Sequence, residues 1–296
     1  MAIDKASVKK KWMNFAERKL RLFRDKFVRK YNKEKLPTEI YNEDQKFYSI
    51  TFCITCMNRL FHLKETLKKN IEDNIKYPNV EFVLINYNSQ DGLDEWVKNN
   101  MQKYIDQGIL SYYHTTEPKN FHASIAKNLA HKVGKGEILC NLDGDNFTGK
   151  DFAYYINYMI NKHGENVLLH FKKKPFWGTE GRIVMSRVNF FKLGGYDETF
   201  LPIGHEDHDL INRAKAFGLE YHNIQIENFL RYLSNSTLEK SINCDEDPEN
   251  YYNYESGNRK VSDDNIANNK LVANLEAGWG KVPLSKNFDK NFLIYE

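Results

Sequence analysis

The chain has 296 residues, of which 41% are hydrophobic and 28% charged, and its formal net charge is +3 at pH 7. This length is enough to bury a full core in one large domain or two small ones. The small net charge excludes a polycation, and four cysteines in so long a chain exclude a disulfide framework. The sequence contains no run of about 18 apolar residues, the length that would be needed to span a membrane.

Residues 1–46 are predicted to form a basic amphipathic helix followed by a linker. Residues 1–36 carry 13 Lys and Arg against four Asp and Glu, which leaves a net charge of −6 on the rest of the chain. Pro37 ends this segment. Apolar side chains at helical spacing mark one face of residues 7–31: Val8, Trp12, Phe15, Leu22, Phe23 and Phe27.

Two interpretations of this helix stay open. It packs on its own domain, or it lies on a membrane surface with aromatic side chains among the lipid headgroups and cations on anionic lipid. A basic patch confined to one end favours a docking segment, so no nucleic acid partner is expected. Because the N-terminus lacks the apolar segment of a secretory signal, we expect a cytoplasmic protein, with peripheral association at the inner membrane face through residues 7–31 as the second interpretation.

Residues 47–235 alternate between strand and helix patterns. Strands are predicted at residues 49–56, 80–86, 110–114, 166–171 and 183–186, with another from residue 138 onward, and helices at 60–71, 93–107, 124–133, 152–161 and 188–193. Strands alternating with helices of 10–15 residues predict an α/β domain with a mixed, mostly parallel sheet flanked by helices. Cys53 and Cys56 lie in an apolar run without a second cysteine pair, which favours a packing role over a zinc site.

Residues 236–296 are polar and rich in asparagine, with tyrosines clustered at 251–254. This pattern predicts an irregular C-terminal extension that packs on the core, with one small strand at 271–275.

The apolar run at 138–142 leads directly into Asp143-Gly144-Asp145. Carboxylates at the end of a buried strand emerge at the edge where open α/β sheets bind ligands. Two hard oxygen ligands suit Mg²⁺ or Mn²⁺ carrying a substrate phosphate. A solvated turn is the alternative for this triplet taken alone.

A second cluster of ionisable residues, Gly204-His-Glu206-Asp207-His-Asp209-Leu210, follows about 60 residues later. A run of charges is often only a solvated surface. Adjacent acids where a loop enters a helix are also typical of sites in which one carboxylate acts as a general base.

Taken together and in this order, the motifs resemble a family-2-like inverting glycosyltransferase of the GT-A fold, with a Glu-Asp element similar to that of the β-1,4-galactosyltransferases. The resemblance covers about residues 48–235. It rests on six segments: Phe52 to Arg59, Val83 to Asp91, Asn120 to Ala130, Asn141 to Asp145, Gly181 to Asp197, and Gly204 to Leu210.

The resemblance implies a sugar transfer from a nucleoside diphosphate sugar, with UDP as the expected nucleotide, to a hydroxyl of a glycan or lipid-linked saccharide in polysaccharide biosynthesis. The transferred group would be a hexose or an N-acetylhexosamine. The implied donor-nucleotide residues are Thr55, Arg59, Asn86, Asp91, Asn128 and Asp143, and the implied acceptor or sugar residues are Trp177, Gly181 and Glu206.

Asp143 and Asp145 are the implied metal ligands for Mn²⁺ or Mg²⁺, which would neutralise the diphosphate leaving group. Asp207 is the implied general base, with Glu206 orienting the acceptor. The third ligand stays open between Asn235, His222 and water, because the histidine of the galactosyltransferases has no counterpart near Leu233-Ser-Asn235.

Many relatives have an aspartate that contacts uracil where Asn86 and Tyr87 stand here, so this chain departs from the family pattern at the position that recognises the base. The competing interpretation is a catalytically inactive GT-A-fold protein that binds carbohydrate or serves as a scaffold. Retention of both carboxylate pairs argues against it.

Overall fold

Alternating apolar residues in the strands send side chains to opposite faces of one sheet. Phe52 and Ile54 point into one core cluster and Cys53 into the other, as the two-residue period of a strand requires. The structure is a computed structural model that describes residues 36–172, 178–235, 239, 243–244, 250–275 and 278–295. The chain divides into two units, residues 1–35 and 36–296, and every described residue belongs to the second. The predicted helix at 7–31 and Trp177 lie outside the described residues.

The main sheet has eight strands in the order β10-β3-β2-β1-β4-β7-β6-β8. Strands β3, β2, β1 and β4 run parallel, β7 is antiparallel to both of its neighbours, and β10 is antiparallel to β3. The strands are β1 Ile50–Cys56, β2 Val80–Tyr87, β3 Leu110–Thr115, β4 Ile138–Asn141, β6 Val167–Phe171, β7 Ile183–Ser186, β8 Glu220–Ile224 and β10 Ser285–Lys286. A small second sheet pairs β5 Asn146–Phe147 with β9 Arg231–Tyr232.

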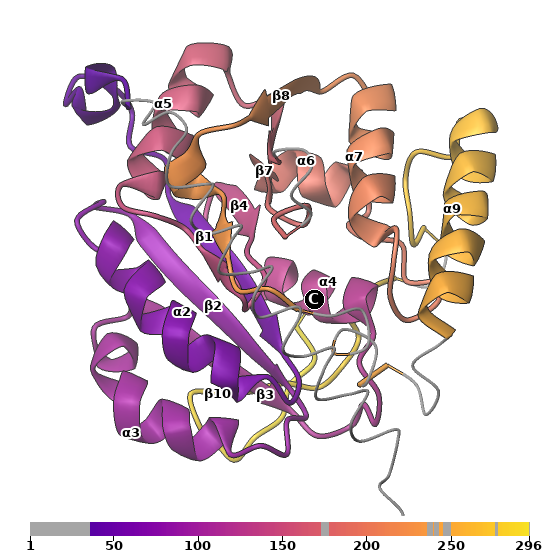
Figure 1. The fold of residues 1–296 in the computed structure, drawn as a ribbon, viewed down its shortest axis with the longest axis horizontal. Coiled ribbons are helices and arrows are strands. Elements are labelled where there is room, and N and C mark those ends of the chain that lie inside the picture. Colours follow the sequence, from indigo (N-terminus) through magenta and orange to yellow (C-terminus); the bar gives the residue numbers. More distant parts are fainter. Residues whose placement is uncertain are drawn as a thin grey trace, which may run out of the picture. The chain divides into compact units, whose positions relative to one another are not determined.

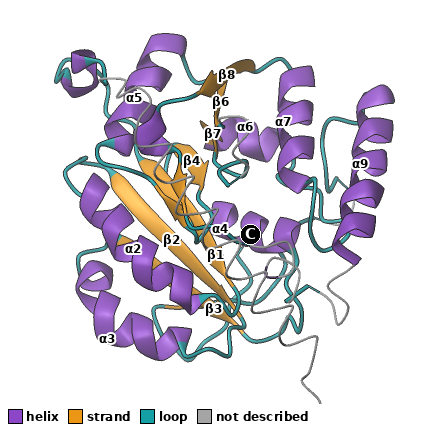
Figure 2. Cartoon of the chain, viewed as in Figure 1, coloured by secondary structure: helices purple, strands orange, loops and turns teal. Residues whose placement is uncertain are grey.

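Helices cover both faces of the main sheet (Figures 1 and 2). One core cluster joins the strands to α2 Leu60–Asn74, α3 Leu93–Asp106 and α5 Phe152–His163, and the other joins them to α4 Ala123–Val133, α6 Arg187–Lys192 and α7 Glu206–Ala216. Short 3₁₀ turns lie at η1 Thr38–Tyr41 and η2 Glu227–Phe229. The predicted mixed, mostly parallel sheet flanked by helices is therefore confirmed.

The C-terminal extension differs from the prediction. Residues 251–267, expected to be irregular, form the helix α9 Tyr251–Ala267, and residues 271–275 form no strand. The helix was missed because its buried positions, Asn258 and Ser262, are polar and give no apolar stripe. The segment at 271–275 contains Asn274 with a φ of 57°, which is incompatible with a regular strand.

No helix in the described part of the chain is long and apolar enough to cross a membrane.

Candidate active site

The Asp143-Gly144-Asp145 triplet lies just beyond the carboxyl end of β4, at the edge that it shares with the parallel strand β1. The N–H of Leu142 donates to the Cys53 carbonyl at 2.9 Å, which continues the pairing up to the triplet. The Asn141 amide donates to Asp143 Oδ1 at 3.2 Å and to the Gly181 carbonyl at 2.8 Å. This amide thus fixes the Asp143 carboxylate against the segment that contains Gly181.

Gly181 separates the two predicted carboxylate clusters. A β-carbon at this position would lie 2.7 Å from Asp143 Oδ2 and 2.9 Å from Asp207 Oδ2. The carboxylates that follow β4 and begin α7, more than 60 residues apart in the chain, therefore meet across one glycine. A side chain at residue 181 would therefore press against both carboxylates.

We predict that Gly181→Ala weakens Mn²⁺-dependent donor binding about tenfold to a hundredfold, since a forced contact of this kind costs roughly 1–3 kcal/mol. Titration of the purified variant with nucleotide and Mn²⁺ measures the effect. Gly257→Ala in α9 is the matched control, because its nearest neighbour, 3.2 Å away, is the end of the Leu201 side chain. Wild-type donor affinity in Gly181→Ala would contradict the arrangement.

Lys127 of α4 joins the two acids at the start of α7. Its ammonium lies 2.9 Å from Glu206 Oε1 and 2.7 Å from Asp207 Oδ1, and all three side chains are largely buried. The second Glu206 oxygen accepts the N–H of Gly204 at 2.9 Å. One cation thus contacts both carboxyl groups.

These contacts move the two carboxyl groups in opposite directions. Burial raises the pKa of Asp207 to about 7, the charges of Glu206 and Asp143 add to this rise, and Lys127 opposes it. Burial also disfavours the charge on Glu206, but Lys127 and the Gly204 N–H outweigh it and lower the pKa of Glu206. A pair of acids with separated pKa values is typical of acid–base sites.

Lys127 was not predicted as a site residue, although it lies in the segment Asn120 to Ala130 on which the resemblance rests. The sequence does contain a signal for this residue: a stripe of polar side chains along a helix whose other residues are mostly small or apolar. Ser124, Lys127, Asn128 and His131, three or four residues apart, are all buried. A lysine on such a face needs a buried anion as partner.

Asp145 contacts the segment predicted to supply a third metal ligand. Asn235 donates from Nδ2 to Asp145 Oδ2, and the Leu233 N–H donates to the Asp145 carbonyl at 2.7 Å. Asn235 Oδ1 is buried and makes no hydrogen bond to any described residue. An unsatisfied amide oxygen on a residue that contacts Asp145 fits Mg²⁺ or Mn²⁺, which prefer oxygen ligands.

Arg182, which was not predicted as a site residue either, lies near the triplet. It is fully buried, and its Nη2 donates to Asn146 Oδ1 at 2.8 Å. Burial lowers the pKa of Arg182 to about 10 despite the charges of Asp143 and Asp145. The guanidinium remains charged at neutral pH and offsets part of the charge of the triplet.

Three of the residues predicted to bind the donor nucleotide lie at or just beyond the carboxyl ends of β1 and β2. Thr55 is half-buried near the end of β1. Arg59 precedes α2 and donates to the Glu239 carbonyl, and Asp91 Oδ2 accepts the Leu60 N–H at 2.7 Å. Asp91 therefore holds the first turn of α2, and Arg59 joins the start of this helix to residue 239.

Asn86 is buried and uses its whole amide within the protein. Nδ2 donates to Asp94 Oδ1 at 2.8 Å and to the Tyr112 hydroxyl at 2.9 Å, while Oδ1 accepts the Ser89 N–H at 2.8 Å. In the structure Asn86 shapes the turn after β2.

Asn128 clamps the segment after α6. Its Nδ2 donates to the Tyr196 carbonyl at 2.8 Å and to Glu198 Oε1 at 2.9 Å, and its Oδ1 accepts the Tyr196 N–H at 2.8 Å. Its contacts fix the chain leading to α7.

His222 lies on β8, the edge strand, three strands away from β4. Its partners are Glu220 and His163. The structure therefore separates His222 from Asp143 and Asp145, and it corrects the suggestion that this histidine completes their metal site.

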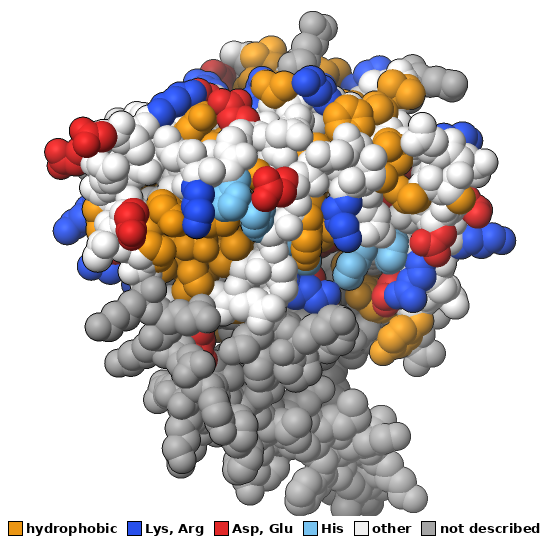
Figure 3. Space-filling model, turned by 90° about the horizontal axis from the view of Figure 1, so that it is seen from above, with side chains coloured by type: hydrophobic (Ala, Val, Ile, Leu, Met, Phe, Trp, Pro, Cys, Tyr) orange, Lys and Arg blue, Asp and Glu red, His pale blue; other side chains and the backbone are white. Residues whose placement is uncertain are grey.

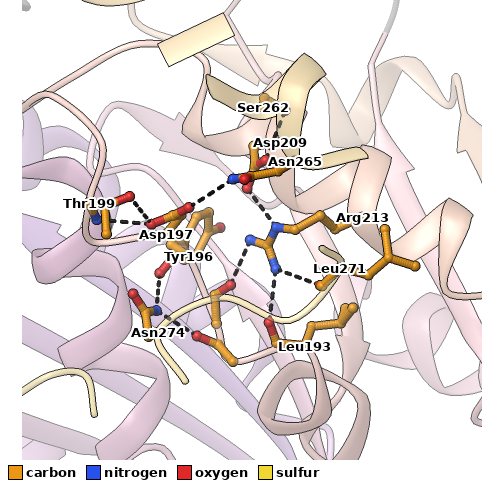
Figure 4. A network of polar contacts seen from close by, with 12 residues as sticks. Leu193, Tyr196, Asp197, Thr199, Asp209, Arg213, Ser262, Asn265, Leu271 and Asn274 are labelled. Carbon is orange, nitrogen blue, oxygen red and sulfur yellow. Dashed lines mark hydrogen bonds and ion pairs between the residues drawn. The ribbon is translucent and has the colours of Figure 1, made fainter. Parts of the chain in front are cut away.

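A buried polar network holds α7, which carries the two acids (Figure 4). Arg213 Nε lies 2.7 Å from Asp209 Oδ2, and its two terminal nitrogens donate to the carbonyls of Leu193 at 2.9 Å and Gly195 at 2.8 Å. Asp209 Oδ1 accepts the Ser262 hydroxyl of α9 at 2.8 Å. The network joins α7 to α9 and to the segment after α6.

Comparison with solved structures supports the fold. The mannosyltransferase PcManGT from Pyrobaculum calidifontis, in complex with GDP-Man and Mn²⁺, matches with a TM-score of 0.54 and 17% identity over 77% of this chain and 70% of that one. S. aureus TarS 1–349 matches with a TM-score of 0.51 and 15% identity over 77% and 76% of the two chains. GalNAc-T7 with UDP, GalNAc and Mn²⁺ matches with a TM-score of 0.51 and 16% identity over 68% and 49%.

A search of curated proteins found no match. The structural neighbours are GT-A enzymes, and the chain has the GT-A fold. The family described as "Glycosyl transferase family 2" matches residues 51–221, which is more than half of the sequence and spans Asp143, Gly181 and Asp207. The chain belongs to glycosyl transferase family 2.

Proposed function

We propose that this chain is a metal-dependent inverting glycosyltransferase that moves a hexose or N-acetylhexosamine from a UDP-linked donor to a hydroxyl of a glycan or lipid-linked acceptor. The observation that carries the proposal is the meeting of Asp143 and Asp207 across Gly181. One carboxylate belongs to the oxygen-rich triplet and the other begins α7, so donor and acceptor would be brought to the same point.

Asp143 and Asp145 would hold the divalent ion, with Asn235 Oδ1 as the candidate third protein ligand. When bound, the ion supplies charge neutralisation to the diphosphate leaving group. The complexes of PcManGT with GDP-Man and Mn²⁺ and of GalNAc-T7 with UDP, GalNAc and Mn²⁺ support a nucleotide sugar and a divalent metal here.

Asp207 would accept the proton of the acceptor hydroxyl as the new bond to C1 of the sugar forms and the bond from C1 to the diphosphate breaks. A carboxyl with a pKa of about 7 is a stronger base than an ordinary aspartate and is still ionised in a useful fraction at neutral pH. Lys127 would keep Asp207 and Glu206 in place, and Glu206 would orient the acceptor.

A donor panel tests the proposal. Nucleoside diphosphate release is measured for UDP- and GDP-linked hexoses and N-acetylhexosamines, with Mn²⁺ and saccharide acceptors. We expect turnover with a UDP-sugar that stops when the metal is chelated. If no donor is bound or consumed with any divalent ion, the inactive carbohydrate-binding or scaffold protein becomes the better interpretation. The similarity of the Glu-Asp element to that of the β-1,4-galactosyltransferases stays a prediction, which the same donor panel tests.

The rate should depend on the ionisation of Asp207. We predict that kcat/KM rises as the pH increases through about 7, because only the ionised carboxylate accepts a proton. Lys127→Met removes the cation that favours ionisation, so the midpoint should move to higher pH. Lys68→Met, an exposed change on α2, is the control and should leave the profile unchanged. A flat profile in the wild type, or an unchanged midpoint in Lys127→Met, would contradict this role.

A further inference from the structure

Three potential metal ligands gather at the far edge of the sheet, where α5 ends beside β8. His163 is the last residue of α5, and Glu220 and His222 lie two residues apart on β8, so their side chains leave the same face of the strand. Glu220 Oε1 lies 2.8 Å from His222 Nε2 and 3.4 Å from His163 Nδ1. Figure 3 views this side of the molecule and shows histidine and acidic side chains next to one another.

The geometry of these atoms is close to that of a coordination sphere. One ligand atom from each residue lies within 4.8 Å of the others, and within the described part of the chain this is the only such group of three or more His, Cys, Asp or Glu residues. Ligands 2.0–2.1 Å from a tetrahedral zinc ion lie about 3.3 Å from one another. The distances from Glu220 Oε1 to His222 Nε2, 2.8 Å, and to His163 Nδ1, 3.4 Å, lie on either side of this value.

The surroundings of His222 add a second observation. Its Nε2 is buried from solvent, and although it lies 2.8 Å from Glu220 Oε1, it makes no hydrogen bond to a described residue. Buried polar atoms in proteins are normally hydrogen-bonded. A metal ion held between Glu220 and His222 would give this nitrogen a partner of the kind that the donor set predicts.

We propose that His163, Glu220 and His222 form a zinc site separate from the Asp143–Asp145 triplet. Two imidazoles and a carboxylate are a common donor set for Zn²⁺ with water as the fourth ligand. The side chain of Glu220 is 57% exposed, so solvent reaches the site. The donor set also differs from the all-oxygen triplet, which favours Mg²⁺ or Mn²⁺.

The position of the site indicates a structural role. Among the described residues, strand β8 lies at one end of the sheet and pairs only with β6. An ion bound by both elements would tie this edge strand to the end of α5, and a cation is also favoured at the C-terminus of a helix. Since zinc would bind the folded chain more tightly than the unfolded chain, it should raise thermal stability.

Zinc binding to the full chain, stripped of metal with a chelator, tests the proposal. Competition with a chromogenic zinc indicator should give one site that is retained in Asp143→Asn. His222→Ala should weaken it about 100-fold or more, since losing even a hydrogen-bond partner of a ligand costs 10–100-fold. His114→Ala is the matched control, because His114 lies on β3 near the opposite edge and should leave zinc affinity unchanged.

Two further measurements keep the test decisive. If His222→Ala does not fold, Glu220→Gln and His163→Gln replace side chains of similar size and should also lose the site. Co²⁺ should give the intense visible absorption of tetrahedral coordination in the wild type and lose it in these variants. An absence of zinc binding, or equal zinc affinity in the wild type and the ligand variants, would show that His163 and His222 only form ion pairs with Glu220.

Discussion

Replacing Asp207 with Asn is expected to lower kcat about 10²- to 10⁴-fold, the usual contribution of a general base. Asparagine keeps the shape of the side chain but cannot accept the proton of the acceptor hydroxyl. Its neighbours Lys127 and Gly181 would remain where they are. Initial rates of nucleoside diphosphate release at saturating donor and acceptor measure the loss.

Asp143→Asn is the matched variant on the other side of Gly181. It should weaken Mn²⁺-dependent binding of the donor nucleotide, whereas Asp207→Asn should bind that nucleotide almost as the wild type does. The two variants thus separate the metal–donor half of the site from the acceptor half. Loss of nucleotide binding in Asp207→Asn, or turnover at the wild-type rate, would reject Asp207 as the base.

Replacing Arg213 with Met should cost about 3–5 kcal/mol of stability, the range for breaking a buried ion pair from one side. Asp209 is fully buried and would keep only the Ser262 hydroxyl among the two side-chain partners described above. The carbonyls of Leu193 and Gly195 would also lose a donor. Urea unfolding followed by circular dichroism measures the change in the midpoint.

Arg259→Met in α9 is the control for this change. Arg259 forms an exposed pair with Glu255 one turn away, so its loss should be worth less than about 0.5 kcal/mol. Adding Asp209→Leu to Arg213→Met should recover part of the stability, because the unpaired buried charge is then removed. A loss below about 1 kcal/mol for Arg213→Met would contradict a supporting role for the network.

The sheet could be predicted from the sequence because its strands are short apolar runs between turn residues. The strand predicted at 183–186 matches β7 at both ends. The strand predicted at 80–86 begins where β2 begins and ends one residue earlier than β2 does. Long-range pairing has no such local signal. That β7 runs antiparallel between β4 and β6 follows from the route of the chain, which periodicity does not describe.

The carboxylates of the candidate site could be predicted as residues but not as a constellation. Asp143 and Asp207 each belong to a recognisable motif, yet nothing in their spacing places them on either side of Gly181. Lys127 and Arg182 were not predicted because the sequence does not show which lysine or arginine side chains become buried in the fold. Their roles depend on anions that only the folded chain brings near.

The helix α9 was missed for a related reason. Its buried positions Asn258 and Ser262 bind polar groups of other segments, including the Gly204 carbonyl and the Asp209 carboxylate. Amphipathic patterns detect helices that bury apolar surface, and this one is held by hydrogen bonds instead.

The anomeric configuration of the product tests the central claim most directly. With the donor that the panel identifies, proton NMR of the first product formed reads the configuration at C1 of the transferred sugar. A single displacement assisted by Asp207 predicts a configuration opposite to that in the donor. Retention of the donor's configuration would contradict the proposed division of work between Asp143 and Asp207.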